Sequence, residues 1–527
     1  MFFYQRSIPG REPTVAIIGA GFGGIAMAAY LKRSNLTKFT VYERSGRAGG
    51  TWWDNQFPGA ACDVESRLYS LSFSPGDWRS SYADQADIQH YMEQVINNEG
   101  LRDHFSFENA VAAVRWNHEL ECWTVETERG DCVNFDVVVS ALGMLNNPAY
   151  PEWTGLDEFG GVSFHTARWE HGRDLSNARV GVVGTGATAA QVVPRLAETC
   201  KELVVFQREP AWVAPKPTRN YTPFERAVSK RRWLSRLQRA AIFLRTELRI
   251  LSAKPGSRGH ARAERELRSY LTSAVPDAKL RDALSPDYPF RCKRVVRSSE
   301  FYPALMRSNV SLVPFAVSSA TRGGVVDTTG HHHPLDALVF ATGFKASEFL
   351  ATLPVHGPAG RTIQQEWDGD ARALLGITYP GFPNFFMLYG PNTNPATASA
   401  LFHIECQARY VARAVRQIAR LRGGRLQART SVLERYDSWL MNALGKTALA
   451  GSCNSYYRGA SGRILTNWPH TSSLYWMLTR LPLFLTLKVE RAGVGSATRG
   501  VALDVLENKS ANEGELVARP GGGDLEG

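Results

Sequence analysis

Cysteine is scarce in this chain, and the spacing of its cysteines argues against several kinds of chemistry. Seven cysteines occur among 527 residues, at positions 62, 122, 132, 200, 292, 406 and 453. Their number is odd, and no two of them have the C-x-x-C spacing of zinc or redox motifs. We therefore expect a reducing compartment and no disulfide, zinc or dithiol chemistry.

Long apolar runs are also missing. No stretch reaches the roughly 18 apolar residues that a membrane span needs. The nearest candidate, residues 474–489, is interrupted by Arg480 and Pro482. Residues 1–13 contain no sustained apolar segment of the kind found in signal peptides. The sequence therefore predicts a cytoplasmic protein without an integral membrane segment.

Patterns for nucleic-acid and metal binding are absent as well. The net charge of +11 would suit nucleic acid, a membrane surface or anionic cofactors. However, no helix-turn-helix, zinc-finger or RNP-like pattern occurs. Three histidines, His331 to His333, stand in a turn-rich stretch without a carboxylate cluster, and adjacent histidines cannot all face one ion. We expect neither a nucleic-acid partner nor a metal site.

The N-terminal part of the chain carries a dinucleotide-binding pattern. Residues 14–18 are an apolar run, Gly19, Gly21 and Gly24 follow in a turn, and residues 25–31 have helical composition. A second strand then ends at Glu43, 24 positions after Gly19. In such a unit the glycines let the backbone approach a pyrophosphate, and the acid binds a ribose hydroxyl pair. The alternative is a glycine-rich turn in an unrelated α/β fold.

A second pattern of the same kind begins at residue 178. The strand 178–183 precedes a G-x-G-x-x-A turn formed by Gly184, Thr185, Gly186, Ala187, Thr188 and Ala189. The next strand, 203–206, is followed by Gln207 and Arg208 where an NAD site would have an acid. Arg208 can bind a 2′-phosphate, which predicts NADP as the second nucleotide. Alternatively, Arg208 is an ordinary surface arginine.

The order of these patterns predicts an α/β fold with two Rossmann-like dinucleotide-binding domains, the second inserted in the first. Residues 133–139 and 336–341 both read as strands that end in a small-residue turn. We expect residues 1–146 and 344–507 to form the first domain and 147–343 the second. A helical insertion at about 222–290 would expose a basic face to solvent, a membrane or a partner. Residues 508–527 are expected to be disordered.

Three motifs resemble those of the Baeyer–Villiger monooxygenases, which are class B flavoprotein monooxygenases, and the resemblance covers about residues 12–480. The first, F-x-G-x-x-x-H-x-x-x-W, is matched by Phe159, Gly161, His165 and Trp169, but Glu170 departs from the Pro or Asp that follows it. The second, G-x-W-x-x-x-x-[FY]-P-G-x-x-x-D, runs from Gly50 to Asp63. The third, D-x-x-[IV]-x-[AC]-T-G-[FY], runs from Asp336 to Phe344.

This resemblance implies a reaction and its cofactors. FAD would bind in the first domain and NADPH in the second. NADPH would reduce the flavin, and O2 would form a C4a-peroxyflavin. That species would insert one oxygen next to the carbonyl of an apolar small-molecule ketone, whose size the resemblance leaves open, and give an ester or lactone. An N- or S-oxygenating monooxygenase, an NADPH-dependent flavin oxidase or reductase, and a non-catalytic nucleotide-binding protein are the alternatives.

The resemblance also implies roles for individual residues. Arg294 would be the catalytic arginine, because a guanidinium stabilises developing negative charge without losing its proton. Asp63 would hold it in place. Phe159, Gly161, His165 and Trp169 would couple domain rotation to cofactor position, or simply pack an interface. The residues expected to contact the cofactors are Gly19, Gly21, Gly24, Glu43, Gly50, Thr51, Trp52, Asp54, Asp63, Tyr69, Gly184, Thr185, Gly186, Ala187, Thr188, Ala189, Gln191, Gln207, Arg208 and Lys293. The last three fall at the positions that contact the 2′-phosphate of NADP in the family.

Arg291 stands where the family commonly has a small residue, often glycine. We hypothesise that its side chain contacts the 2′-phosphate or an acidic substrate. The Michaelis constants for NADPH and substrate in Arg291→Gly would test this contact. The identity of the ketone and the oligomeric state are not readable from the sequence.

Overall fold

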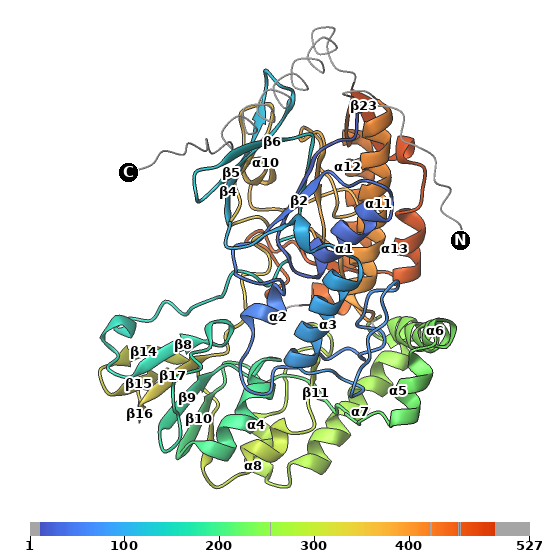
Figure 1. Cartoon of the computed structure of the whole chain (residues 1–527). Coiled ribbons are helices and arrows are strands. Elements are labelled where there is room, and N and C mark those ends of the chain that lie inside the picture. The colour runs from blue at the N-terminus through green and yellow to red at the C-terminus, as the bar shows by residue number, and fades with distance from the viewer. Residues whose placement is uncertain (1–10, 253, 422–423, 452, 454, 491–527) are drawn as a thin grey trace, which may run out of the picture.

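Two five-stranded parallel sheets organise the chain, as Figure 1 shows. The computed structural model describes residues 11–490 apart from 253, 422–423, 452 and 454. The tail expected at 508–527 and the end of the segment 344–507 lie outside the described residues. In Figure 1 the first sheet lies in the upper half of the view and the second in the lower half.

The first sheet has the strand order β19-β7-β1-β2-β3, with all neighbours parallel. Its strands are β1 (Val15–Ile18), β2 (Phe39–Tyr42), β3 (Phe105–Ser106), β7 (Val137–Ser140) and β19 (Phe385–Met387). Strands β1, β7 and β19 are buried along their whole length. Burial on both faces explains why their sequences are nearly continuous apolar runs.

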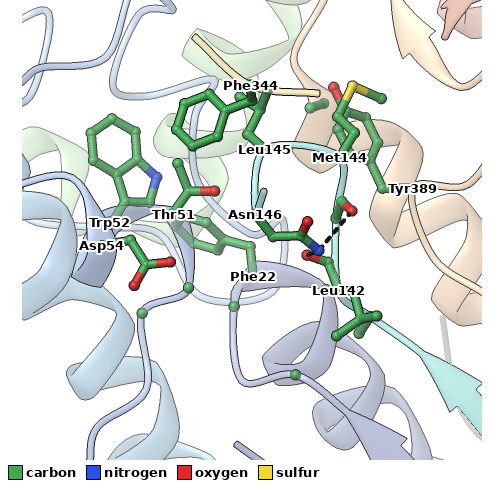
Figure 2. A pocket seen from close by; sticks show the side chains of 18 of the residues that line it. Phe22, Thr51, Trp52, Asp54, Leu142, Met144, Leu145, Asn146, Phe344 and Tyr389 are labelled. Atoms are coloured by element: carbon green, nitrogen blue, oxygen red, sulfur yellow. Dashed lines mark hydrogen bonds between the residues drawn. The ribbon is translucent and has the colours of Figure 1, made fainter. Parts of the chain in front are cut away.

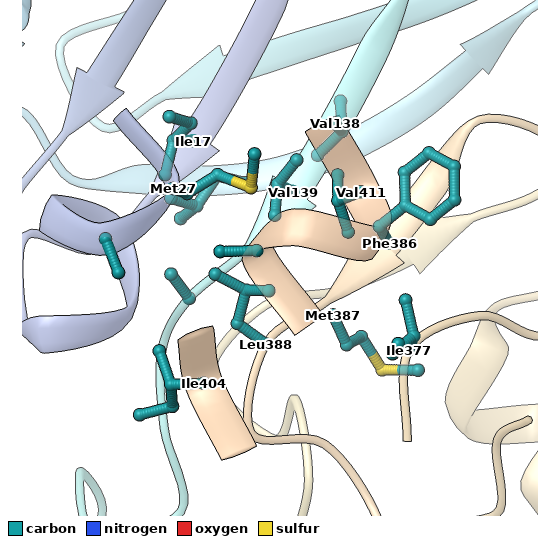
Figure 3. Close-up of a cluster of buried hydrophobic side chains, with 14 of the residues drawn as sticks. Ile17, Met27, Val138, Val139, Ile377, Phe386, Met387, Leu388, Ile404 and Val411 are labelled. Atoms are coloured by element: carbon teal, nitrogen blue, oxygen red, sulfur yellow. The ribbon is translucent and has the colours of Figure 1, made fainter. Parts of the chain in front are cut away.

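Helices α1 (Phe22–Lys32) and α11 (Ala400–Arg420) pack against each other beside this sheet. Figure 3 shows the core that results, with Met27 of α1 and Ile404 and Val411 of α11 beside Val139 of β7. All of α1 from Phe22 to Leu31 is buried, since the sheet and α11 enclose it. Truncating one such large side chain to alanine would cost about 2–5 kcal/mol.

The second sheet has the order β13-β10-β9-β17-β8 and is also parallel throughout. Its strands are β8 (Val162–His165), β9 (Arg179–Val183), β10 (Glu202–Phe206), β13 (Val310–Val313) and β17 (Ala337–Phe340). Helices α4 (Ala189–Thr199) and α9 (Phe301–Leu305) pack together, and their buried residues share one core with those of the sheet. Strand β8 places the Phe159–Trp169 motif at an edge of this sheet.

Smaller sheets and further helices complete the described chain. One small sheet has the order β18-β4-β5-β6, and another β14-β15-β16. Their strands are β4 (Val111–Asn117), β5 (Cys122–Thr127), β6 (Cys132–Phe135), β18 (Val355–His356), β14 (Val317–Thr321), β15 (Gly324–Asp327) and β16 (His332–Pro334). The two-stranded pairs are β11 (Val213–Ala214) with β12 (Val296–Arg297), β20 (Asn394–Pro395) with β22 (Asn467–Trp468), and β21 (Arg425–Ala428) with β23 (Leu487–Glu490). The remaining α-helices are α2 (Thr51–Asp54), α3 (Gln85–Asn98), α5 (Pro223–Ser229), α6 (Arg232–Leu248), α7 (Arg258–Ala274), α8 (Ala278–Ala283), α10 (Ile363–Trp367), α12 (Thr430–Leu444) and α13 (Ser472–Leu478).

The stretch 133–139, expected as one strand, is divided between two sheets. β6 ends at Phe135 and β7 begins at Val137. The carboxylate of Asp136 accepts hydrogen bonds from the backbone N–H of Thr14 at 2.8 Å and from its hydroxyl at 3.1 Å. This partly buried contact holds the chain where it passes from one sheet to the other. The apolar pattern of the sequence does not reveal it.

One expectation about cysteine is wrong, because Cys292 and Cys453 form a disulfide bond. Their Cα atoms lie 6.2 Å apart, although 161 positions separate them in the sequence. No local spacing marks such a pair, since only the fold brings the two segments together. The other five cysteines are free. Among the described residues, no helix has both the length and the apolar character needed to cross a membrane.

Candidate active site

The first glycine turn connects β1 to α1 and leaves no room for a side chain at Gly19 or Gly24. Gly19 has φ +103°, and a Cβ on it would lie 2.9 Å from the carbonyl oxygen of Ala141. A Cβ on Gly24 would lie 1.9 Å from the carbonyl oxygen of Gly19. The turn is therefore pressed between its own strand and the loop after β7, as a phosphate-binding turn requires.

Glu43 closes this turn from the end of β2. Its buried carboxylate accepts hydrogen bonds from the backbone N–H of Ala20 at 2.7 Å and of Ser45 at 2.9 Å. Each of its oxygens keeps a further lone pair, and the residue lines the large cavity described below. The geometry suits a ribose hydroxyl pair.

The second glycine turn repeats the construction of the first. Gly184 follows β9 with φ +112°, and a Cβ on it would lie 2.8 Å from the carbonyl oxygen of Ala341. The surroundings of Gly186 leave open space for a Cβ. The hydroxyl of Thr185 donates to the carbonyl oxygen of Glu209 at 3.0 Å. Both turns thus rest on a small-residue loop that follows the neighbouring strand.

A single cavity of about 680 Å³ joins the two turns. From the first half of the chain it is lined by Gly19, Gly21, Glu43, Gly50, Thr51, Trp52, Asp54, Asp63 and Tyr69, and from the second turn by Gly186, Ala187, Thr188 and Gln191. Figure 2 shows part of its wall, where Trp52 and Asp54 lie across from Met144 and Tyr389. The indole N–H of Trp52 donates to the hydroxyl of Tyr69 at 2.9 Å. Gly24 and Ala189 are not among the residues that line the cavity.

Arg294 and Asp63 meet at the cavity although 231 positions separate them. The Nε of Arg294 donates to Oδ2 of Asp63 at 3.1 Å, and Nη2 donates to the same oxygen. Burial raises the pKa of Asp63, but the charges of Arg294, Arg297 and Lys216 outweigh it and bring the pKa below its usual value. The carboxylate of Asp63 raises the pKa of Arg294 well above its ordinary value. Both groups therefore stay ionised at neutral pH.

Contacts between the two halves of the site fix their relative position. The side-chain amide of Gln191 donates to the carbonyl oxygen of Ala61 at 2.9 Å and accepts from its N–H at 3.2 Å. Arg168, within the Phe159–Trp169 motif, lies 3.4 Å from the carboxylate of Asp54. These bonds join α4 and the motif directly to the segment 50–63.

The four motif residues lie at the edge of the second sheet and are not among the residues that line the cavity. A Cβ on Gly161 would lie 2.3 Å from the carbonyl oxygen of Asp336 and 2.7 Å from the ring of Phe159. The ring of Trp169 packs edge-on against Phe164 at 5.0 Å. His165 is fully buried and donates from Nε2 to the carbonyl oxygen of Gly343 at 3.0 Å. The motif therefore contacts the connection after β17, next to the cavity wall at Phe344.

Protonation of His165 is unfavourable, which predicts a pH-dependent stability. Burial, opposed by the bond to Gly343, lowers the pKa of His165 to about 4. Between about pH 6.5 and pH 4 the unfolded chain binds a proton that the folded chain does not, so stability falls as the pH falls. Going from about pH 7.5 to about pH 5, the wild type should lose about 2 kcal/mol more than His165→Gln, which keeps the donor.

Urea unfolding at both pH values measures this difference. His171→Gln is the matched control, because it replaces an exposed histidine of the same segment. Parallel pH profiles for the wild type and His165→Gln would contradict the assignment.

The residues expected at the 2′-phosphate do not all face one point. The side-chain amide of Gln207 is buried and donates to the carbonyl oxygen of Ala283 at 2.7 Å. Arg208 is exposed. Lys293 forms an ion pair with the carboxylate of Glu209. No sequence pattern singles out Glu209, because its contact is with a residue 84 positions away.

Arg291 adopts a left-handed backbone with φ +64°. Glycine is favoured in this region, which explains the small residue of the family pattern at this position. Its guanidinium lies 5.6 Å from the ring centroid of Phe290. Contact between Arg291 and a phosphate or an acidic substrate stays a prediction.

Several wall residues of the cavity could not be recognised in the sequence. Met144, Leu145 and Phe344 come from the two loops that carry the glycines 143 and 343, while Tyr389 and Tyr456 come from distant segments. A tyrosine after a strand or in a loop has no distinctive local signal. Their position follows from the packing of the C-terminal third on the two sheets.

Comparison with known proteins agrees with this geometry. The family model for flavin-binding monooxygenase-like proteins matches residues 12–352. A Baeyer–Villiger monooxygenase of Streptomyces coelicolor is 39% identical over 492 residues, which cover 92% of this chain and 94% of that protein. One from Pseudomonas aeruginosa is 34% identical over 474 residues, covering 89% and 90%.

Solved structures give the same picture. A closed structure of cyclohexanone monooxygenase matches with a TM-score of 0.82 and 27% identity, covering 91% of this chain and 99% of that one. Oxidised steroid monooxygenase bound to NADP matches with a TM-score of 0.79 and 28% identity, covering 91% and 99%. The chain therefore belongs to the flavin-binding monooxygenase-like family, and within it to the Baeyer–Villiger monooxygenases. The expected fold with two dinucleotide-binding domains is confirmed.

Proposed function

We propose that the chain binds FAD at the unit from Gly19 to Glu43 and NADPH at the unit from Gly184 to Arg208, and oxygenates an apolar small-molecule ketone between them. One observation carries this proposal: both turns and the Arg294–Asp63 pair line the same cavity. When bound, FAD would accept two electrons from NADPH and activate O2. Ketone, O2, NADPH and a proton would give ester or lactone, NADP⁺ and water.

The residues at the first turn fit FAD. Without side chains at Gly19, Gly21 and Gly24, the backbone N–H groups at the start of α1 can approach a pyrophosphate. Glu43 offers two carboxylate oxygens to the ribose. Gly50, at the start of α2, has φ +52°, and a Cβ on it would lie 2.9 Å from Gly21 Cα. Residues 50–54 therefore close over the first turn at a distance that only glycine allows.

The residues at the second turn fit NADPH. Gly186 and the N-terminus of α4 offer a pyrophosphate site, and Arg208 offers a cation for a 2′-phosphate. The solved structures similar to this chain include complexes described as containing NADP, and one containing FAD and NADP. We assign the same two nucleotides to this chain.

Arg294 would act on the reacting oxygen atoms from the wall of the cavity. Its side chain is 42% exposed, against 19% for Asp63, and both residues line the cavity. A guanidinium there stabilises negative charge that develops during oxygen transfer. Asp63 orients the guanidinium and limits its repulsion of other cations. Met144, Leu145 and Phe344 supply apolar surface for a ketone.

Labelled dioxygen tests the proposal on a panel of cyclic and linear ketones. We expect one labelled oxygen atom in the ester or lactone and the other in water, with one NADPH consumed per product. Hydrogen peroxide without any oxygenated product from this panel would contradict the proposal and favour an oxidase. Labelled sulfoxide or N-oxide from a parallel panel, with no ester, would favour the heteroatom-oxygenating alternative.

Glu209 is expected to weaken the preference for NADPH. Its carboxylate already neutralises Lys293, so a 2′-phosphate must compete with it for that lysine. Glu209→Gln should lower the KM for NADPH about fivefold, since the pair is partly exposed, and leave the KM for NADH unchanged. Steady-state kinetics with both nucleotides measure this.

Glu202→Gln serves as the control, because it removes the same charge at the opposite end of β10. Equal changes for NADPH and NADH in Glu209→Gln would show that Glu209 does not face the 2′-phosphate.

A further inference from the structure

The Cys292–Cys453 disulfide joins two connecting segments beside the cavity. One is the 284–295 segment, between α8 and β12, which carries Lys293 and Arg294. The other is the 445–466 segment, between α12 and β22. Cys292 is fully buried and Cys453 is 8% exposed. The bond therefore ends two residues from the arginine to which we assign oxygen transfer.

The 445–466 segment contributes directly to the cavity and to the surroundings of Arg294. Tyr456 lines the cavity, and its ring centroid lies 4.3 Å from that of buried Tyr457. Both tyrosines are close enough to act electrostatically on Arg294. The position of this segment thus affects both the shape of the cavity and the field at the guanidinium.

The 445–466 segment is held by hydrogen bonds of its own near Cys453 and by bonds to other parts of the chain further along, where Ser461 donates to Asp370 at 2.6 Å and Arg463 pairs with Asp437. Arg458 donates to the carbonyl oxygens of Leu449 at 2.9 Å and of Gly451 at 2.5 Å. A Cβ on Gly451 would lie 3.2 Å from Sγ of Cys292, so the two segments are in close contact at the bond. The disulfide is a covalent attachment of the part of this segment around Cys453 to the 284–295 segment.

We propose that Cys292 and Cys453 form a reversible redox site that positions the 445–466 segment, the loop that carries Tyr456, against Arg294. The oxidised pair holds this loop in place, and reduction releases it. The site's existence is independent of the proposed function, whereas its effect on catalysis rests on that function. Reduction would let Tyr456 move away from the cavity, which would enlarge the cavity there and change the surroundings of Arg294. Oxygen transfer would then slow.

The oxidising step requires a peroxide, and hydrogen peroxide is sufficient. One thiolate attacks a peroxide oxygen, the O–O bond breaks, and a sulfenic acid and the first water form. The second thiol attacks that sulfur, the S–S bond forms, and the second water leaves. Two thiols thus lose two electrons and two protons to one hydrogen peroxide. A dithiol reductant reverses the change by attacking Cys453, the more exposed sulfur, through a mixed disulfide.

The chemical state of the pair is measured first, on the full-length holoenzyme. After treatment with hydrogen peroxide and removal of the excess, non-reducing digestion should give a peptide that links Cys292 to Cys453. Of seven cysteines, five should react with a thiol reagent in the denatured protein, and all seven after dithiothreitol. Absence of the linked peptide after peroxide would overturn the proposal.

Limited trypsin digestion then tests the release of the loop without relying on activity. Cleavage after Lys446 or Arg458 should be about tenfold faster in the reduced protein, because the loop opens locally. Cys453→Ser should be cleaved at the reduced rate under both conditions. Cys132→Ser, which removes an exposed free thiol, should respond to reductant like the wild type. Equal cleavage rates for oxidised and reduced wild type would overturn the proposal.

Kinetics of the two forms complete the test. Reduction should lower kcat/KM for the ketone about tenfold and leave the anaerobic rate of flavin reduction by NADPH unchanged. Cys453→Ser should show the lower value with and without reductant. Identical ketone kinetics in both forms would overturn the link to Arg294. If neither form oxygenates a ketone while the linked peptide and the cleavage difference are found, the proposed function fails and the redox site stands.

Discussion

Replacing Arg294 with alanine is expected to lower the rate of ketone oxygenation about a thousandfold. The guanidinium lines the cavity and is the group that Asp63 fixes there. Because its pKa lies well above the ordinary value, it keeps its charge throughout the reaction. NADPH should still reduce the flavin, since neither nucleotide turn contains Arg294. The variant should therefore consume NADPH and release hydrogen peroxide instead of ester.

The measurement is the ratio of ester formed to NADPH consumed. Arg307→Ala is the control, because Arg307 is an exposed arginine of the same half of the molecule. Arg294→Lys should recover little activity, since an ammonium cannot reproduce the two donations to one carboxylate oxygen. An Arg294→Ala enzyme that still couples NADPH to ester within a fewfold of wild type would refute the assignment.

Asp63→Asn completes a double-mutant cycle with Arg294→Ala. If Asp63 acts only through Arg294, the two losses will not add. The lowered pKa of Asp63 means that its stabilising charge is present above the ordinary carboxyl pKa and is lost only as the pH falls through the lower value. The pair should therefore contribute no pH dependence to kcat from about pH 6 to about pH 9.

Replacing Gly24 with alanine should remove both the flavin and much of the stability of the first domain. The new Cβ would lie 1.9 Å from the carbonyl oxygen of Gly19, which is backbone within a turn pressed against Ala141. Neither atom can move without displacing β1 or α1, both of which are buried. We expect a loss of about 4 kcal/mol or more in the free energy of unfolding, with or without FAD.

Gly21→Ala is the matched comparison. Its Cβ would meet only Gly50 Cα, at an ordinary contact distance of 3.7 Å, yet Gly21 lines the cavity. The Gly21→Ala apoprotein should therefore unfold at the wild-type temperature while FAD binds more weakly. Absorption of the bound flavin and thermal unfolding of the apoproteins measure both effects. A Gly24→Ala protein with wild-type stability and a full complement of FAD would contradict this account.

Local sequence patterns predicted the parts of the site that one strand–turn–helix unit builds. Gly24 and Glu43 act through contacts with residues fewer than about 25 positions away, so their spacing in the sequence already predicts their geometry. The position of Arg294 and Asp63 beside each other came from the family resemblance, because no local rule relates two residues 231 positions apart.

Contacts that only tertiary structure creates were missed. The side-chain amide of Gln207 donates to a carbonyl group of α8, part of an insertion whose packing the sequence does not specify, and its contact with the phosphate stays a prediction. Glu209 and Tyr456 belong to segments without a motif. The Cys292–Cys453 pair was excluded on spacing and cysteine count, although a disulfide depends only on Cα and Cβ positions in the fold.

The most direct measurement mixes the purified, flavin-loaded protein with NADPH without oxygen, then with oxygen and a ketone, while absorption and products are followed. If both nucleotide turns serve one cavity, NADPH will bleach the flavin band, and oxygen will restore it with one ester or lactone formed per NADPH. If NADPH leaves the oxidised flavin unchanged, the two turns do not serve a common site and the central claim is wrong.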